Sequence, residues 1–398
     1  MSHFLQEADA VVVGGGVIGA SVAFHLTCAG LRPVLCEGLD LASGSSGACD
    51  GLVFLQSKKP GIHLHLALES QRRLEALRCV LPMEFEYLRR GGLVVIGDEA
   101  EYAAMERYVT AQRQNGLDVR LVDGCEARRL EPALAAGTHA AAYSPLDAQI
   151  NPLRLTFALA AGARRNGARI LTRTRVTGFE RRAGAICAVA TSRGSIQTGT
   201  VVLATGADTP RLASLMGLDL PIRPRRGQLL VTAPLAPLLR HCLISAHYIA
   251  VKYDPALAAR DGASVSMEQT ERGNLLLGST REFAGYDRHT TVAGIQSIAA
   301  ACTRIVPALK TVQVIRSFAG LRPWTPDGLP LLGPVPEVPG LLLAAGHEGD
   351  GIALSAITGA LIAEWITSGH PHIDVQDFSP ARFSDRASPK LAVNGIAS

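Results

Sequence analysis

Three glycines near the start of the chain have the types and spacing of a ligand-binding turn. Gly14, Gly16 and Gly19 fit G-x-G-x-x-G within VVVGGGVIGA, between a strand-like run and a helix-like run. They would respectively permit a tight turn, let the backbone approach a pyrophosphate, and let the helix pack closely on the sheet. Glu37, about twenty residues further on, would accept hydrogen bonds from a ribose. The pattern predicts a dinucleotide site and leaves open whether the ligand is FAD or NAD.

A second glycine-rich turn lies near the far end, in LAAGHEGDGIALS at 343–355. An NAD domain would need only the first turn, whereas FAD carries a ring system that must be held far from its adenine. Backbone N–H groups of 346–351 could face the flavin pyrimidine, and the helix that begins at Ile352 would direct its positive N-terminus there. The two turns together favour one extended FAD.

The elements that must position these turns follow from periodicity. Residues 9–13 and 33–37 predict buried strands on either side of a helix over 17–29 that ends at Gly30, which makes a βαβ unit. Further helices are predicted near 62–90, 98–115, 151–166, 292–302 and 352–366, and further strands near 168–172 and 195–204. After Gly217 the runs QLLVTAP, SVSMEQT and NLLLGST predict an antiparallel sheet.

The expected fold class is α/β, with a discontinuous Rossmann-like FAD-binding domain and an α+β substrate domain whose sheet is mostly antiparallel. We predict that the FAD-binding domain comprises 1–90, 145–222 and 320–375. The substrate and interface domain would comprise 91–144 and 223–319, and 376–398 would form a C-terminal tail.

Composition excludes several classes of protein. The 398 residues carry 39 basic and 35 acidic side chains, a net charge of +4 that gives no electrostatic footprint for nucleic acid. The densest basic run, RPRR at 223–226, is typical of a solvated or partner-facing turn. A hydrophobic content of 47% and a mean hydropathy of +0.20 indicate a buried parallel sheet or a sizeable subunit interface.

The eight cysteines form no C-x-x-C pair, so neither a zinc site nor an iron–sulfur centre is expected. His63 and His65 form a lone H-x-H whose side chains would point apart on a helix, so no metal site is expected there either. The N-terminus lacks a signal-peptide pattern and no apolar run looks long enough to span a membrane, which favours a cytoplasmic protein.

Several motifs taken together resemble one known family. They are VVVGGGVIGASVAFHL, ASGSSGACDGL, VVLATGAD, PRRGQLL, GNLLLGSTREF, AGLRPWTPDGLPLLGP and AGHEGDGIALSAITG, in family order. With them, the chain resembles the D-amino-acid oxidase-like flavoproteins over most of its length. The most similar branch holds glycine oxidase, the hydrogen cyanide synthase subunit, and the catalytic subunits of opine, proline and D-hydroxyproline dehydrogenases.

The resemblance implies an extended, non-covalently bound FAD, with the segment Ser43 to Gly51 at its phosphates and ribityl chain. A flexible linker is the alternative for that segment. The cofactor-binding residues expected on this basis are Gly14, Gly16, Val17, Ile18, Gly19, Glu37, Gly38, Ser43, Ser45, Ser46, Gly51, Leu52, Val176, Ala204, Thr205, Gly206, Gly346, His347, Gly349, Asp350, Gly351 and Ile352.

The resemblance also places Arg322, in AGLRPWTPDG, at the substrate carboxylate, which arginine can bind bidentately. A structural salt bridge beneath the sheet is the alternative. By the same family pattern, the pocket would be lined by Gln228, Ser266, Met267, Tyr248 and His347. Several relatives carry a tyrosine where this chain has Ser266, while an insertion here brings His247, Tyr248, Lys252 and Tyr253. This departure favours a bulkier N-substituted or a cyclic amino acid.

The function expected is hydride transfer from the C–N bond of an amino acid to FAD, with an opine, D-hydroxyproline or proline as substrate. The chain would be the catalytic subunit of a hetero-oligomeric dehydrogenase, with an iron–sulfur protein and a second flavoprotein as partners. An FMN or an iron–sulfur cluster would be held with or by those partners. The alternatives are a free-standing glycine, sarcosine or D-amino-acid oxidase that uses O2, and a non-catalytic FAD-binding scaffold subunit. An NAD-linked disulfide reductase would need a redox cysteine pair, which is missing.

Overall fold

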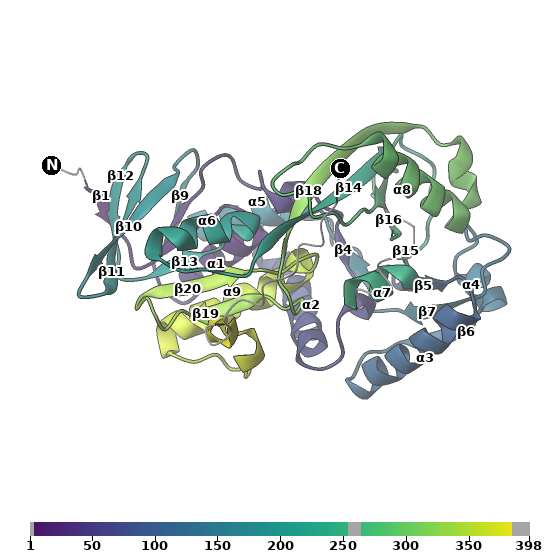
Figure 1. Ribbon diagram of the computed structural model, residues 1–398, viewed down its shortest axis with the longest axis horizontal. Helices are drawn as coiled ribbons and strands as arrows, with labels where there is room; N and C mark the ends of the chain where they lie inside the picture. Colours follow the sequence, from purple (N-terminus) through teal and green to yellow (C-terminus); the bar gives the residue numbers. More distant parts are fainter. Residues whose placement is uncertain (1–3, 254–263, 384–398) are drawn as a thin grey trace, which may run out of the picture.

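A six-stranded sheet forms the core of one half of the molecule, on the left in Figure 1. The computed structural model describes residues 4–253 and 264–383. All neighbouring strands of this sheet are parallel except the edge strand, which is antiparallel to the next. The strands in spatial order are β19 (Leu331–Pro334), β20 (Leu341–Ala345), β13 (Val201–Leu203), β2 (Val11–Val13), β3 (Val34–Cys36) and β9 (Arg169–Leu171).

Apolar helices cover this sheet, which is why its strands read as continuous hydrophobic runs. They are α1 (Val17–Cys28), α5 (Pro152–Arg165) and α9 (Gly351–Ser368), and α2 (Ile62–Val80) packs against α9. Among the described residues, α9 is one helix long and apolar enough to cross a membrane, so the expectation that no run would qualify was wrong. Because α9 packs against α1 and α2 and is mostly buried, we assign it to the protein core.

A four-stranded sheet extends the same half outward and was not expected in full. The predicted strand at 195–204 divides into two strands that belong to different sheets, on either side of Thr198 to Thr200. The outer sheet contains, in spatial order, β1 (Phe4–Glu7), β12 (Gly194–Gln197), β11 (Ala185–Thr191) and β10 (Val176–Arg182). A separate two-stranded antiparallel ladder pairs β4 (Leu52–Val53) with β8 (Ala148–Gln149).

The other half contains an eight-stranded sheet, and its long strands β14 and β18 reach back to the first half (Figure 1). Every neighbouring pair is antiparallel except β15 with β5, which confirms the mostly antiparallel second sheet. The spatial order is β18 (Val314–Trp324), β14 (Arg223–Thr232), β17 (Leu275–Gly278), β16 (Ser266–Gln269), β15 (Cys242–Ser245), β5 (Gly92–Ile96), β7 (Ala140–Ser144) and β6 (Arg120–Asp123).

Most predicted helices form where periodicity placed them. Side-chain caps fix two starts: Asp98 accepts from the Glu101 N–H at α3 (Glu99–Gln114), and Asn151 accepts from the Arg154 N–H at α5. By contrast α2 ends at Val80 rather than near residue 90, because Leu81 precedes a proline and takes an extended conformation. The remaining helices are α4 (Gly124–Leu130), α6 (Thr209–Ala213), α7 (Ala246–Tyr253) and α8 (Val292–Ile305). The predicted domain limits stay a prediction; β18 runs across the limit at 320.

Candidate active site

A cavity of about 590 Å³ lies where the two halves meet. Its wall includes the residues that directly follow β2, β3 and β13, hence the carboxyl ends of parallel strands. Ligands of open α/β sheets bind at this edge. Further parts of the wall come from β14, β18, the second glycine turn and the segment that follows β3, together with Tyr248 of α7.

In the first glycine loop, close contacts leave no room for a side chain at two of the glycines. Gly14 has φ +111°, and a Cβ on it would lie 2.5 Å from the carbonyl oxygen of Ala204. A Cβ on Gly19 would lie 1.9 Å from the carbonyl oxygen of Gly14. A Cβ on Gly16 would meet only the Ser46 hydroxyl, at 3.1 Å, so the surrounding protein does not by itself demand glycine there. A phosphate chain could approach the backbone at this open face of Gly16.

The carboxylate of Glu37 is fixed in the cavity wall by backbone donors. Oε2 accepts from the Gly15 N–H and Oε1 from the Leu39 N–H, both at 2.7 Å. Each carboxylate oxygen keeps capacity for a further hydrogen bond, so the group can still accept from ribose hydroxyls. The geometry fits the role predicted for this acid.

The serine-rich segment after β3 is ordered by contacts to both halves. The Ser46 hydroxyl accepts from the Val17 N–H at the start of α1, at 3.0 Å, and the Ser45 hydroxyl donates to the carbonyl of Leu321 in β18. A Cβ on Gly320 would lie 2.1 Å from the carbonyl oxygen of Ala48, so this strand and the segment touch closely. The segment is therefore a built wall of the cavity rather than a flexible linker.

The second glycine turn carries a neutral histidine. His347 lines the cavity, and its Nε2 lies 3.1 Å from the Thr358 hydroxyl. Burial lowers the pKa of His347 to about 3, and the nearby His63 lowers it further while Asp350 opposes the shift. At neutral pH the imidazole is therefore uncharged, and the helix N-terminus, rather than this ring, supplies positive potential.

Most of the expected cofactor residues line this one cavity. They are Gly14, Gly16, Val17, Ile18, Glu37, Gly38, Ser43, Ser45, Ser46, Leu52, Val176, Ala204, Thr205, Gly206, His347, Gly349, Gly351 and Ile352. Segments from five separate parts of the chain are thus brought to one elongated space.

Four expected residues lie behind the cavity wall instead, namely Gly19, Gly51, Gly346 and Asp350. A Cβ on Gly51 would lie 1.8 Å from the carbonyl oxygen of Ile150, and Gly346 has φ +80°. The Asp350 carboxylate points away from the cavity to Lys58 Nζ at 2.9 Å and to His63 Nε2 at 3.4 Å. These residues shape or support the wall, and the Asp350 side chain is held by Lys58 and His63 rather than turned toward the cavity.

Arg322 lines the cavity beside the second glycine turn, where a Cβ on Gly349 would lie 3.7 Å from its Nε. Its Nη1 donates to the Thr280 carbonyl at 3.0 Å and its Nη2 to the Ser279 hydroxyl at 2.9 Å. A Cβ on Gly227 of β14 would lie 2.1 Å from Nη1, so this glycine makes room for the guanidinium. Within the described residues, no carboxylate forms an ion pair with Arg322, in contrast to the alternative of a structural salt bridge.

Other charges surround Arg322. Arg225 is buried and forms an ion pair with Glu348 of the second glycine turn, and burial lowers the pKa of Arg225. The Arg281 guanidinium stacks 4.2 Å from the centre of the Tyr248 ring, which lines the cavity. Burial raises the pKa of Tyr248, so the phenol stays protonated at neutral pH. This end of the cavity is electropositive.

Two of the expected pocket residues point away from the cavity. The Gln228 amide faces the start of α8, where Nε2 donates to the Thr291 hydroxyl at 3.1 Å and Oε1 accepts from the Thr291 N–H at 2.8 Å. Met267 is fully buried in the apolar core of the second half. Both face away because side chains alternate along a strand, and the sequence motif did not show which face meets the ligand.

Ser266 contributes indirectly, since its hydroxyl donates to Oδ2 of the cavity-lining Asp50 at 3.1 Å. Of the insertion residues, His247 and Tyr248 are described, whereas the side chains of Lys252 and Tyr253 and the residues 254–263 lie outside the described part. Sequence reasoning missed Asp50, Glu268 and Lys58. The one available signal was an acid directly before Gly51 in a segment otherwise made of small residues.

The comparisons with known proteins agree with this geometry. Residues 9–365 match the family model described as FAD dependent oxidoreductase, DAO. The chain belongs to this family. It is similar to hydrogen cyanide synthase subunit HcnC of Pseudomonas aeruginosa, with 32% identity over 94% of this chain and 96% of that protein. It is also similar to an opine oxidase subunit of Agrobacterium tumefaciens, with 29% identity over 95% and 98%.

Among solved structures, the L-proline dehydrogenase from P. horikoshii superposes with a TM-score of 0.87 at 27% identity, covering 95% of this chain and 98% of that one. This member of the DAO family is an FAD-dependent oxidoreductase that acts on amino acids. Its cavity fits the cofactor: the open face of Gly16, the fixed Glu37 carboxylate and the second glycine turn would hold successive parts of FAD. When bound, FAD supplies the hydride acceptor.

Proposed function

We propose that the chain oxidises the C–N bond of a secondary or N-substituted amino acid, such as an opine, D-hydroxyproline or proline. Arg322 is the observation that carries this proposal. It is a cavity-lining guanidinium without an acidic partner among the described residues. Two of its five N–H donors are used by neutral oxygens, which orient the group and leave donors for a ligand. A substrate carboxylate is the ligand that such a site favours.

The reaction needs orientation more than a protein nucleophile. A hydride leaves the α-carbon efficiently only when that carbon is held close to the acceptor, so a two-point grip on the carboxylate contributes to the rate. Tyr248 supplies an apolar ring beside the carboxylate site, and neutral His347 lines the wall near the second glycine turn. These residues would exclude water and orient the substrate.

The choice of an N-substituted substrate rests on the space around Ser266. A serine there reaches only to Asp50, whereas a tyrosine would extend into the cavity. Two relatives support the choice, because one is named for opines and the other for L-proline, and both compounds are secondary amines. Glycine or sarcosine oxidation by a free-standing oxidase is the second candidate.

We further propose that the chain is the catalytic subunit of a hetero-oligomer in the cytoplasm, with the flavin held non-covalently. Two relatives are named as subunits. Within residues 4–253 and 264–383, no group of histidine, cysteine or acidic side chains could hold a metal ion. On this proposal, electrons that leave the FAD pass to a partner, where an FMN or an iron–sulfur cluster in a second flavoprotein or iron–sulfur protein would accept them.

The experiment that tests the substrate is bleaching of the flavin without oxygen. The purified yellow protein is mixed with D- and L-proline, hydroxyprolines, opines, sarcosine and glycine, and the flavin absorbance is followed. We expect rapid bleaching by a secondary or N-substituted amino acid and much slower bleaching by glycine. Equal or faster bleaching by glycine would favour the oxidase alternative, and no bleaching by any of them would contradict amino acid oxidation.

The electron acceptor is tested separately with the same preparation. We expect the isolated chain to reduce an artificial dye much faster than it reduces oxygen, and to co-purify with small subunits when it is expressed from its native neighbourhood. Stoichiometric hydrogen peroxide formed at the full turnover rate would show instead that the chain is a free-standing oxidase.

A further inference from the structure

Two carboxyl groups that family resemblance did not indicate meet at the substrate end of the cavity. Asp50 lines the cavity and accepts from the Ser266 hydroxyl at 3.1 Å. Glu268, on the same face of β16 as Ser266, accepts through Oε1 from the Gly51 N–H at 2.8 Å. Asp50 contacts Ser266, and Glu268 contacts the residue that follows Asp50. The two carboxyl groups therefore lie close together.

Glu268 is the less usual member of the Asp50/Glu268 pair. It is 4% exposed, and among the described residues its Oε2 is buried with no hydrogen-bond partner. Burial, with the neighbouring Asp50, raises the pKa of Glu268 to about 8, while the Gly51 N–H opposes the shift. At neutral pH Glu268 therefore holds its proton. A buried acid oxygen without a partner is costly, so its presence requires a physical explanation.

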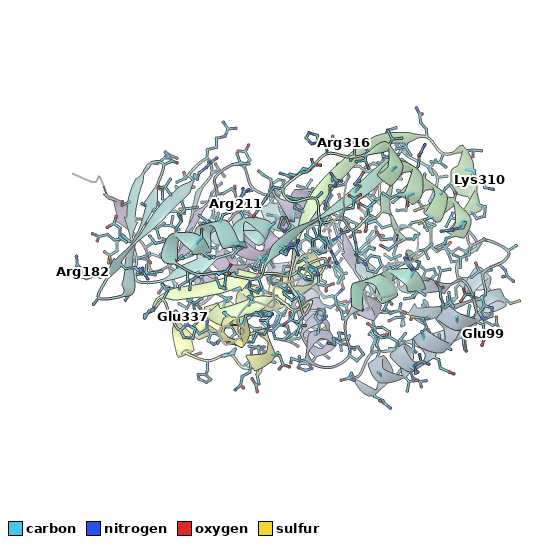
Figure 2. All side chains as sticks on the ribbon, in the orientation of Figure 1. Glu99, Arg182, Arg211, Lys310, Arg316 and Glu337 are labelled. Carbon is cyan, nitrogen blue, oxygen red and sulfur yellow. The ribbon has the colours of Figure 1, made fainter. Side chains whose placement is uncertain are left out.

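Glu268 also lines a second cavity, of about 500 Å³. This cavity lies behind the segment Ser46 to Cys49, whose residues Ser46, Ala48 and Cys49 also line the first cavity. Its wall includes the exposed side chains of Glu271 and Arg316, so it reaches the surface; Figure 2 labels Arg316 on the upper side of the molecule. The pair thus separates the substrate space from an opening to solvent.

Among the other titratable groups near the pair, Asp147 ionises in a similar pH range but lines neither cavity. Burial raises the pKa values of the nearby thiols and phenol, which stay protonated and neutral at pH 7, and raises that of the Asp147 carboxyl to about 7. The groups concerned are Cys49, Cys242, Tyr248 and Asp147 around the pair, with Arg322, Arg90 and Arg288 as the nearby cations.

We propose that Asp50 and Glu268 form a carboxyl pair that takes the proton from the substrate amine and passes it toward the second cavity. The inference rests on the proposed amine oxidation. Amino acids carry a protonated amine at neutral pH, and the nitrogen needs its lone pair before the neighbouring carbon can lose a hydride. With the carboxylate on Arg322, the ammonium group would face the only cavity-lining aspartate at this end among the described residues.

The proton step balances without a redox change. The N–H bond breaks, its electron pair stays on nitrogen, and a new O–H bond forms at Asp50. Glu268 releases its own proton from Oε2 to water in the second cavity, and in its ionised form it then accepts the proton from Asp50. The nitrogen lone pair is left free to form the C=N bond as the hydride departs with the C–H electron pair.

The test compares three variants across pH by anaerobic stopped-flow bleaching, with flavin content measured for each. The wild-type bleaching rate should rise as pH increases through about 8, the pKa of Glu268, because the fully ionised pair accepts protons best. Glu268→Gln keeps the acceptor for the Gly51 N–H and mimics the protonated acid. It should match the wild type near pH 7 and lose the rise above pH 8. Glu271→Gln, the control from the second cavity, should follow the wild type throughout.

Asp50→Asn should slow bleaching about 100-fold at neutral pH, the scale of general acid–base catalysis. Its rate should then recover about tenfold per pH unit, because only substrate that is already deprotonated can react. A purely structural role would lower the rate equally at all pH values. Asp50→Asn with the wild-type profile, or Glu268→Gln with the rise intact, would overturn the proposal.

A second measurement does not depend on turnover. Infrared difference spectra taken stepwise up to pH 10 should show two buried carboxylic acids in the wild type, Asp147 ionising near pH 7 and Glu268 near pH 8, and Glu268→Gln should lose the second band and keep the first. Persistence of both bands in the variant would overturn the pair. If no amino acid bleached the wild-type flavin, the proposed function would fail, while the infrared result would still decide whether this pair stores a proton.

Discussion

The two ends of the main cavity are built by different means. At the first glycine loop the wall is mostly backbone: N–H groups hold Glu37, and glycines are required at positions 14 and 19 by contacts under 3 Å. At the substrate end the wall carries charged side chains from one strand and two loops, including Arg322, Asp50 and Glu348. A cofactor site can thus be encoded in a short local motif, whereas a substrate site needs the whole fold.

The second glycine turn combines both features, a glycine backbone at the cavity and charged side chains in ion pairs. Gly349 and Gly351 face the cavity, yet the acids of the turn form ion pairs on its other side: Glu348 with Arg225, and Asp350 with the buried Lys58. Both pairs are largely removed from water, so each charge depends on its partner. The turn therefore couples the placement of the flavin end to the charges of the substrate end.

The largest effect should come from Gly16→Val. The fold has room for a Cβ at this position, but the side chain would occupy the face that a pyrophosphate needs. We expect a folded, colourless protein that retains no flavin, as measured by absorbance and by circular dichroism. Gly137→Val, at a glycine with no neighbouring atom within 4 Å, should stay yellow. A yellow Gly16→Val protein would show that the first loop is not the pyrophosphate site.

Next in size is Lys58→Met. Lys58 Nζ donates to the Phe54 carbonyl and the Ser57 hydroxyl in addition to its ion pair, and both partners of the pair are nearly inaccessible. Removing it leaves Asp350 without its lysine, which should destabilise the protein by about 3–5 kcal/mol. The readouts are the denaturant midpoint and the rate of flavin release. The exposed neighbour provides the control, since Lys59→Met should change neither.

At the substrate end, Arg322→Lys should lower kcat/KM about 100-fold, or about 2–3 kcal/mol, because a point charge replaces a bidentate contact. The flavin spectrum should be unchanged, since the first glycine loop and Glu37 are untouched. Steady-state kinetics with the best substrate from the bleaching screen provide the measurement. Unaltered kinetics would refute the carboxylate role.

The smallest kinetic effect is expected for Gln228→Leu. Its amide bonds to Thr291 and Glu282 on the face of β14 opposite the cavity. Loss of these bonds should lower stability by about 1–3 kcal/mol. The substrate constant should stay within about twofold of the wild type, measured beside the Arg322 variant. A loss comparable to that variant would mean that Gln228 does reach the ligand.

Local patterns were sufficient for much of the first half. The βαβ unit around Gly14, the αL position of Gly30 at φ +83° and the starts of α3 and α5 could be predicted, because capping and turn chemistry act within a few residues. The end of α2 was missed although Pro82 is a local signal for it. The division of 195–204 between two sheets could not be predicted, because it depends on what the chain packs against after it leaves each strand.

By itself, the sequence determined that an extended dinucleotide is bound and which turns hold it, since steric demands on glycine and the position of one acid are properties of short segments. Only the tertiary structure decided the substrate end. Whether Gln228, Ser266 or Met267 faces the ligand depends on strand register, and Asp50 and Glu268 become partners only because β16 crosses behind the segment that ends at Gly51. These carboxyl groups are separated by more than two hundred residues, and they influence each other only because folding brings them together and buries Glu268.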